Sequence, residues 1–300
     1  MINTMFNNKS YQKHIEHELK QEENKTSYEQ TFTFDTVDYW RHERMLAILK
    51  PIISANPNAS WLTVGDGRFG SDANFLLRNG AKHVHASSIS DYTLKTAAQD
   101  GHIKDFSAQN VERLTFEDKS FDYVLCKEAF HHFPRPFQGL YEMARVARKG
   151  IVLIEPLDPY VSNNVITFFA RGVKDVIKFL LKKTIDKNCF EQSGNYKYMV
   201  SEREIEKYAI AAEANSVIFS YLNDTFINGV QSEKIDHKSA LFKKVKRSIS
   251  KKDLLCKLKI NSYAILCSVI QFSTGTEAIL EACKKEKLAV NWIKLPQNPY

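Results

Sequence analysis

The chain has 300 residues, 43% of them hydrophobic and 26% charged, so it can bury a core and is not a disordered polypeptide. It contains no run of 18 apolar residues and no apolar stretch near its start, which predicts neither a membrane span nor a secretory signal and favours a cytoplasmic protein. The net charge of +7 is concentrated in residues 234–259, where ten Lys or Arg stand against two Asp.

The first part of the chain is expected to be helical. Residues 1–30 are polar and helix-prone over 11–23, and apolar residues recur at helical spacing over 39–53. Short apolar strands then alternate with helices. The predicted strands are 60–64, 83–87, 121–126 and 151–155, and the predicted helices are 71–79, 90–98 and 138–148.

The same alternation returns near the end of the chain. A helix is predicted over 201–214, where Ser201 and Glu204 have the spacing of a capping box, and strands over 217–222 and 263–272 should pair at the sheet edge. Such alternation predicts an α/β fold with a doubly wound, mostly parallel sheet that is covered on both faces.

A glycine-rich turn follows the first predicted strand. Gly65, Gly67 and Gly70 have G-x-G-x-x-G spacing, which lets the backbone turn tightly and a ligand approach closely. In a doubly wound sheet, ligands bind at the carboxyl ends of the strands, where this loop must lie.

Three segments at matching intervals carry a resemblance to a known family. The turn around Gly65, the stretch from 110 through the adjacent His131 and His132, and the strand 151–156 together resemble small-molecule class I methyltransferases of the methyltransferase 11-like group. The resemblance covers residues 35–156 well and residues 200–272 only by the order of elements. It implies a seven-stranded Rossmann-like sheet with helical insertions and S-adenosylmethionine as the cofactor.

The resemblance also implies which residues contact the cofactor. They are Gly65, Asp66, Gly67, Ser88, Ile89, Asn110, Val111, Cys126 and Lys127. Three family acids are replaced, by Thr63, Ser88 and Asn110. Because a carboxylate accepts hydroxyl hydrogen bonds more strongly than a neutral group, we expect a weaker grip on the ribose, with Asp91 as a substitute.

Transfer to a hydroxyl needs a base near the reactive methyl group. His131 and His132 follow the predicted strand 121–126, which corresponds to the fourth strand of the family. His42 and Glu128 are lesser candidates. The motif of amino-methylating nucleic-acid enzymes is absent, which favours O-methylation of a sugar, a lipid-linked glycan or a secondary metabolite. An RNA methyltransferase and a non-catalytic binding or scaffold protein of the same fold remain as alternatives.

A single domain over 1–300 is expected. Residues 1–40 form an N-terminal cap, 41–156 the cofactor-binding half, and 157–199 a lid insertion; 200–228 and 262–300 complete the core around a basic insertion, 229–261. The two segments 1–40 and 157–199 should lie over the crevice and recognise the acceptor, through aromatic residues such as Tyr160, Phe168, Phe169, Tyr196 and Tyr198.

The basic segment 234–259 has the charge to bind an anionic membrane surface, an acidic substrate or nucleic acid. The alternative is that it forms a solvated helix face. Nucleic acid is disfavoured because Phe242 is its only aromatic residue. We expect a small or carbohydrate acceptor, anionic in one interpretation, with peripheral membrane contact as an option. Five scattered cysteines and no Cys/His cluster predict no disulfide framework and no metal site.

Overall fold

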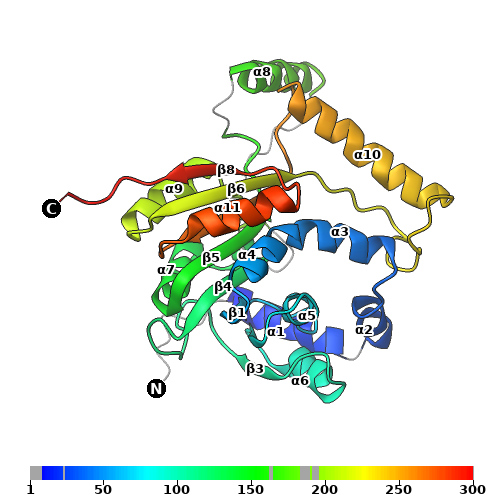
Figure 1. The fold of residues 1–300 in the computed structure, drawn as a ribbon. Helices are drawn as coiled ribbons and strands as arrows, with labels where there is room; N and C mark the ends of the chain where they lie inside the picture. Colours follow the sequence, from blue (N-terminus) through cyan, green and yellow to red (C-terminus); the bar gives the residue numbers. More distant parts are fainter. Residues whose placement is uncertain (1–8, 23, 162–164, 183–189, 191–195, 300) are drawn as a thin grey trace.

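A computed structural model describes residues 9–22, 24–161, 165–182, 190 and 196–299. Eight strands form one sheet in the order β3-β2-β1-β4-β5-β7-β6-β8 (Figure 1). Their bounds are β1 Ser60–Val64, β2 His83–Ser88, β3 Asp105–Ala108, β4 Phe121–Lys127, β5 Ala147–Pro156, β6 Ser216–Leu222, β7 Ile265–Gln271 and β8 Asn291–Lys294.

The sheet is parallel from β3 to β5 and antiparallel where β7 meets β5 and β6. The predicted doubly wound, mostly parallel sheet is confirmed, with eight strands instead of seven. The predicted pairing of 217–222 with 263–272 is confirmed, but β8 covers the outer side of β6, so this pair is not the sheet edge. β8 has only four residues, too few to show a period in the sequence.

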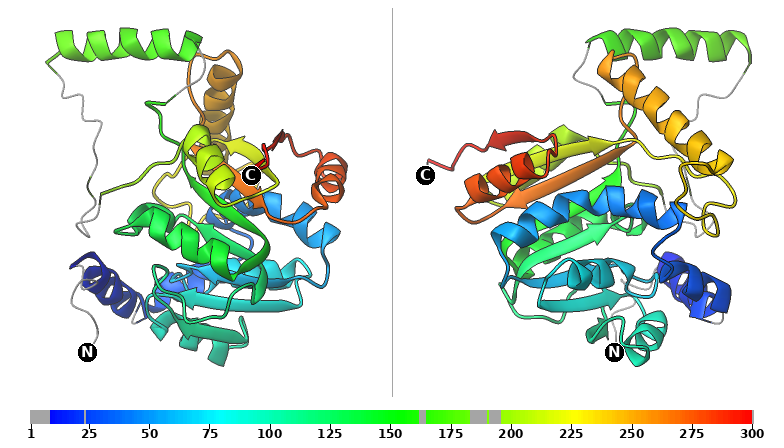
Figure 2. Two further views of the ribbon diagram at one scale, coloured as in Figure 1. Left: turned by 90° about the vertical axis from the view of Figure 1, so that its left-hand side faces the viewer. Right: turned by 45° about the vertical axis from the view of Figure 1, so that its right-hand side comes forward.

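Helices cover both faces of the sheet (Figure 2). The first face carries α4 (Leu49–Ala55), α5 (Ser71–Arg78), α6 (Tyr92–Gln99) and α11 (Thr276–Lys285), and the second carries α7 (Pro136–Val146) and α9 (Glu202–Ala211). β1 shows why both faces are apolar, since Trp61 packs into the first core and Leu62 into the second.

Local sequence features explain most element ends. The predicted capping box of α9 is confirmed, with the Ser201 N–H donating to Glu204 over 2.9 Å. The predicted helix over 39–53 is interrupted: α3 (Val37–Met45) is followed by a 3-10 turn, Leu46–Ile48, and then by α4. The predicted helix over 138–148 ends at Val146, because Ala147 already pairs with Phe121 as the start of β5.

The remaining helices lie outside these two layers. α1 (Lys9–Glu22) and α2 (Lys25–Thr31) precede α3, while α8 (Val165–Leu180) and α10 (Ala240–Lys257) project from the body (Figures 1 and 2). Among the described residues, no helix is long and apolar enough to cross a membrane.

Both insertions leave from the same edge of the sheet. The carboxyl ends of β5 and β6 lie level with each other, because Pro156 and Leu222 each pair with Ile265. α8 follows β5 and α10 follows β6. The basic insertion therefore starts at the carboxyl ends of the strands, on the same side of the sheet as the glycine loop. It packs on α3, where Val37 N–H donates a 2.8 Å hydrogen bond to the Glu233 carbonyl.

Candidate active site

The glycine loop forms one wall of a crevice at the carboxyl ends of β1 and β2. Gly65 follows β1 with φ +72°, and a Cβ there would lie 2.4 Å from the Cβ of Ala129. Both the left-handed backbone and the close neighbour therefore require glycine. Gly67 is also closely approached, since a Cβ there would lie 3.0 Å from Ser88 Oγ and 2.3 Å from a carboxylate oxygen of Glu18.

Five of the predicted residues border this crevice. Gly65, Ser88, Ile89, Val111 and His132 line it, and Gly67 lies against Ser88. Helix α1 contributes a third side through residues spaced three and four apart, which places them on one helix face: Tyr11, His14 and Glu18. About 90 Å³ remains between them, less than the ~300 Å³ or more of a typical small-molecule site. Side chains of α1 thus fill much of the crevice.

The Glu18 carboxylate is the main polar contact between α1 and the crevice. Ser88 Oγ donates to it over 2.5 Å, and the Ser90 hydroxyl donates to its other oxygen. Burial raises the pKa of Glu18, and the two serine hydrogen bonds oppose that shift. A carboxylate that accepts from two hydroxyls has the bonding pattern that an acid makes with the two hydroxyls of a ribose.

The rings of the two predicted catalytic histidines lie 4.0 Å apart, centroid to centroid, but they have different partners. His131 Nδ1 lies 2.5 Å from Glu155, a fully buried carboxylate that also accepts 2.9 Å hydrogen bonds from the N–H groups of Ala129 and Phe130. His131 and Glu155 therefore hold the turn after β4. His132 lines the crevice, with its ring centroid 5.2 Å from that of His14.

Besides Gly67, four predicted cofactor residues lie outside the crevice lining. Asp66 turns inward, accepting from the Thr63 hydroxyl and from two N–H groups at the start of α5; burial, then the charge of Asp72, raise its pKa to about 8. Asn110 accepts from Glu112 N–H over 2.9 Å. Cys126 is buried, and Lys127 lies 3.3 Å from Asp72.

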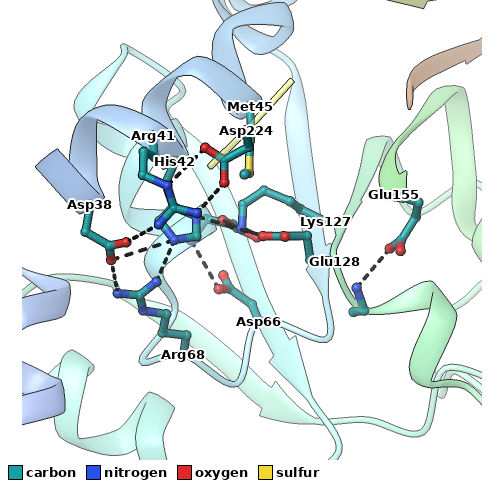
Figure 3. Close-up of polar contacts among 12 residues, drawn as sticks. Asp38, Arg41, His42, Met45, Asp66, Arg68, Lys127, Glu128, Glu155 and Asp224 are labelled. Carbon is teal, nitrogen blue, oxygen red and sulfur yellow. Dashed lines mark hydrogen bonds and ion pairs between the residues drawn. The ribbon is translucent and has the colours of Figure 1, made fainter. Parts of the chain in front are cut away.

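A second polar cluster flanks the glycine loop (Figure 3). Arg68 donates to Asp38 over 2.9 Å and to His42 Nε2 over 2.8 Å. Because Nε2 accepts this hydrogen bond, the proton of neutral His42 is on Nδ1, which lies 3.9 Å from Glu128. Burial, followed by the charges of Lys127, Arg68 and Arg41, holds the pKa of His42 well below its usual value. His42 is therefore uncharged at neutral pH.

Glu128 has an unusual backbone in this cluster. Its φ is +51°, although it is not glycine, and its N–H donates to the Ile154 carbonyl over 2.8 Å. Such conformations persist where the surroundings enforce them, often at functional sites. The two lesser candidate bases of the sequence, His42 and Glu128, are brought together here.

The predicted substitute acid and the predicted aromatic pocket are placed differently from the expectation. Asp91 pairs with Lys95 over 3.0 Å at the start of α6. Phe168 and Phe169 are each 66% exposed on α8. Tyr198 packs on Phe130, and Tyr160 on Arg171.

Glu18 is the residue that the sequence interpretation missed. It lies 70 positions from Ser88, in a polar stretch with no motif. One feature could have pointed to it: the crevice lacks an acid of its own, and α1 carries acids at helical spacing.

The sheet order and the glycine loop define a Rossmann-like fold of the kind found in methyltransferases. Residues 62–154 match the family model described as a methyltransferase domain, so the chain contains a methyltransferase domain of the S-adenosylmethionine-dependent class. This match runs from β1 to β5 and includes the glycine loop, Ser88 and the histidine pair.

One curated relative is 38% identical over 84 residues: the "Probable phthiotriol/phenolphthiotriol dimycocerosates methyltransferase 2" of Mycobacterium ulcerans. The match covers 27% of this chain and 33% of the relative, so it spans about a third of that protein's length.

Solved structures share the fold. The "putative sarcosine dimethylglycine methyltransferase" of Galdieria sulphuraria is 16% identical with a TM-score of 0.50, covering 77% of this chain and 86% of its own. A "putative methyltransferase" of Bacillus halodurans is 20% identical with a TM-score of 0.47, covering 76% and 99%.

Proposed function

We propose that this protein transfers the methyl group of S-adenosylmethionine to a hydroxyl oxygen of a small or medium-sized acceptor, such as a sugar, a lipid-linked glycan or another lipid. The observation that carries the proposal is the crevice between α1 and the matched domain, where the Glu18 carboxylate meets two hydroxyls beside the glycine loop. The lipid in the curated relative's name supports a lipid among the candidate acceptors.

The crevice residues suit the cofactor in their chemistry. Gly65 and Gly67 leave room for the ligand, and Glu18 would accept the ribose hydroxyls in place of the missing acid at Ser88. Arg68 and Glu128 offer opposite charges for the amino and carboxylate groups of the methionine part. The bound cofactor supplies the activated methyl group.

Space requires a rearrangement of α1 on binding. The remaining volume of about 90 Å³ is too small for a nucleoside, so the side chains of Tyr11, His14 and Glu18 must shift while α1 stays within reach. Glu18 then exchanges its serine donors for ribose hydroxyls, which keeps the buried carboxylate hydrogen-bonded in both states.

His132 is our proposed general base. It borders the crevice, whereas His131 is engaged by buried Glu155. Neutral imidazole can accept the proton that the acceptor hydroxyl loses as the oxygen attacks the methyl carbon. Neutral His42, beside Glu128, is the second candidate for this proton.

Cofactor binding and transfer test the proposal in two steps. Thermal-shift titration with S-adenosylmethionine and its demethylated product should raise the melting temperature, and labelled methyl should then enter a lipid or glycan fraction as an ether. Binding without transfer to any acceptor fraction would favour the non-catalytic alternative. We also propose a cytoplasmic location, in keeping with the free thiols of Cys126, Cys256, Cys267 and Cys283.

A further inference from the structure

Helix α8 turns its polar side toward the protein. Thr167 Oγ1 donates to the Lys259 carbonyl over 2.7 Å, Arg171 to the Ser262 hydroxyl over 3.2 Å, and Lys174 to the Asn261 amide oxygen over 3.1 Å. Residues 167, 171, 174 and 178 recur at spacings of three and four, so they share one face of the helix. This face borders a groove of about 390 Å³ against residues 260–264.

The opposite face of α8 is apolar and exposed. Its exposed fractions reach 66% at Phe168 and Phe169 and 75% at Phe179. The other exposed apolar residues of the helix are Val165, Ile166, Val173, Val176, Ile177 and Leu180. A helix on the surface of a globular protein normally has the reverse arrangement, with its apolar stripe toward the core. A contiguous exposed apolar surface of this kind marks an interaction site.

Positive charge lies along α10, whose carboxyl end adjoins α8 (Figure 1). Lys259, Asn261 and Ser262, just after α10, accept the hydrogen bonds from the polar face of α8. α10 carries seven Lys or Arg against one Asp. Six of these cations are exposed: Lys243, Lys244, Lys246, Arg247, Lys251 and Lys257. Two exposed leucines, Leu254 and Leu258, continue the apolar surface toward α8.

We propose that α8 and α10 form a docking surface for an anionic lipid bilayer, with the apolar face of α8 in the headgroup region and the cations of α10 against anionic headgroups. A wide apolar face combined with flanking lysines is what interfacial helices use, and each basic side chain adds attraction to an anionic leaflet. A second copy of the chain is the less suitable occupant, because it would bring the same positive charge to the contact.

Docking would place the side of the sheet that holds the crevice near the membrane. α8 leaves from the carboxyl end of β5, which is the edge of the sheet that holds the crevice. The surface stands on its own observations and does not depend on the proposed reaction.

Vesicle binding of the full chain tests this directly. We would measure co-flotation with vesicles of phosphatidylcholine alone and of phosphatidylcholine mixed with phosphatidylglycerol. The parent should bind the anionic vesicles and lose affinity as salt screens the contact. The double variant Phe168→Ser, Phe169→Ser should bind at least about tenfold more weakly, as should a variant with Lys243, Lys244, Lys246 and Arg247 changed to Glu.

A matched control comes from an exposed aromatic residue far along the chain. Trp292→Ser on β8 removes a side chain that is 41% exposed and should leave vesicle binding unchanged. Equal binding by the parent and the Phe168/Phe169 variant, or no binding of the parent to anionic vesicles, would overturn the proposal. A parent that dimerises in sedimentation equilibrium while failing to bind vesicles, and a monomeric double variant, would instead assign the face to a second copy.

Discussion

Helices α1 and α8 both turn polar side chains toward the protein, but their outer faces differ. The outer side of α1 carries Gln12, Lys13 and Glu16, which water can solvate, while the outer side of α8 carries phenylalanines and aliphatic residues. The inner side of α1 makes buried hydrogen bonds to Ser88 and Ser90, whereas the inner side of α8 borders an open groove.

This difference separates two roles. Both faces of α1 are satisfied without an external partner, because its inner face fills the crevice and its outer face meets water. The apolar face of α8 is exposed, and exposure of apolar surface to water is unfavourable, so this face suits an external partner. We propose that one region serves cofactor binding and the other serves docking, so substitutions in them should have different consequences.

The largest effect should come from the crevice. His132→Ala removes the proposed base, and we expect turnover to fall by about 10²–10⁴-fold while affinity for the demethylated cofactor stays within about threefold. The measurement is single-turnover methyl transfer together with calorimetric binding. His42→Ala is the comparison variant, and a larger loss of turnover there would move the base to the His42–Glu128 pair.

A smaller but still large effect concerns stability near the crevice. Glu155→Ala leaves the N–H groups of Ala129 and Phe130 and the His131 ring without their buried acceptor, so we expect a loss of about 3 kcal/mol in the free energy of unfolding. Urea denaturation measures it. Glu281→Ala, on an exposed position of α11, should change stability by less than about 0.5 kcal/mol. Similar values for the two variants would show that Glu155 does not hold the turn.

The smallest effect should come from α8. Phe179→Ser replaces a side chain that is 75% exposed, so the free energy of unfolding should change by less than about 0.5 kcal/mol. Phe130→Ser, in the second core, should cost about 3 kcal/mol or more by the same urea measurement. A marked destabilisation by Phe179→Ser would mean that this face is packed against the protein in solution, which would remove the contrast between the two helices.

Local patterns predicted the sheet because each core strand is a short apolar run bounded by turn residues. β1, β2, β4 and β5 begin and end within four residues of their predicted bounds. The bounds of β3 and β8 were not predicted because four residues are too few to show a period. The bounds of α10 were not predicted because its charges hide the buried Phe242, Val245 and Ile249.

Side-chain direction explains what the sequence left undetermined at the site. The amphipathic pattern of α8 identifies two faces, but it does not say which one meets the protein, and Phe168 and Phe169 turned outward. The sequence does not distinguish the adjacent His131 and His132, whereas in the structure Glu155 binds His131. Glu18 reaches Ser88 only through the tertiary placement of α1, which no local pattern encodes.

We propose that the crevice binds S-adenosylmethionine with Glu18 as the ribose carboxylate, and calorimetric titration with the demethylated cofactor measures this binding. The parent should bind, and Glu18→Gln should bind about tenfold more weakly, since a charged acceptor is worth roughly 1.4 kcal/mol more than a neutral one. The double variant Glu18→Gln, Ser88→Asp should regain the affinity, because an acid returns to the end of β2. Absence of binding by the parent at millimolar ligand, or tighter binding by Glu18→Gln, would contradict the claim; the latter would make α1 a plug that the cofactor must displace.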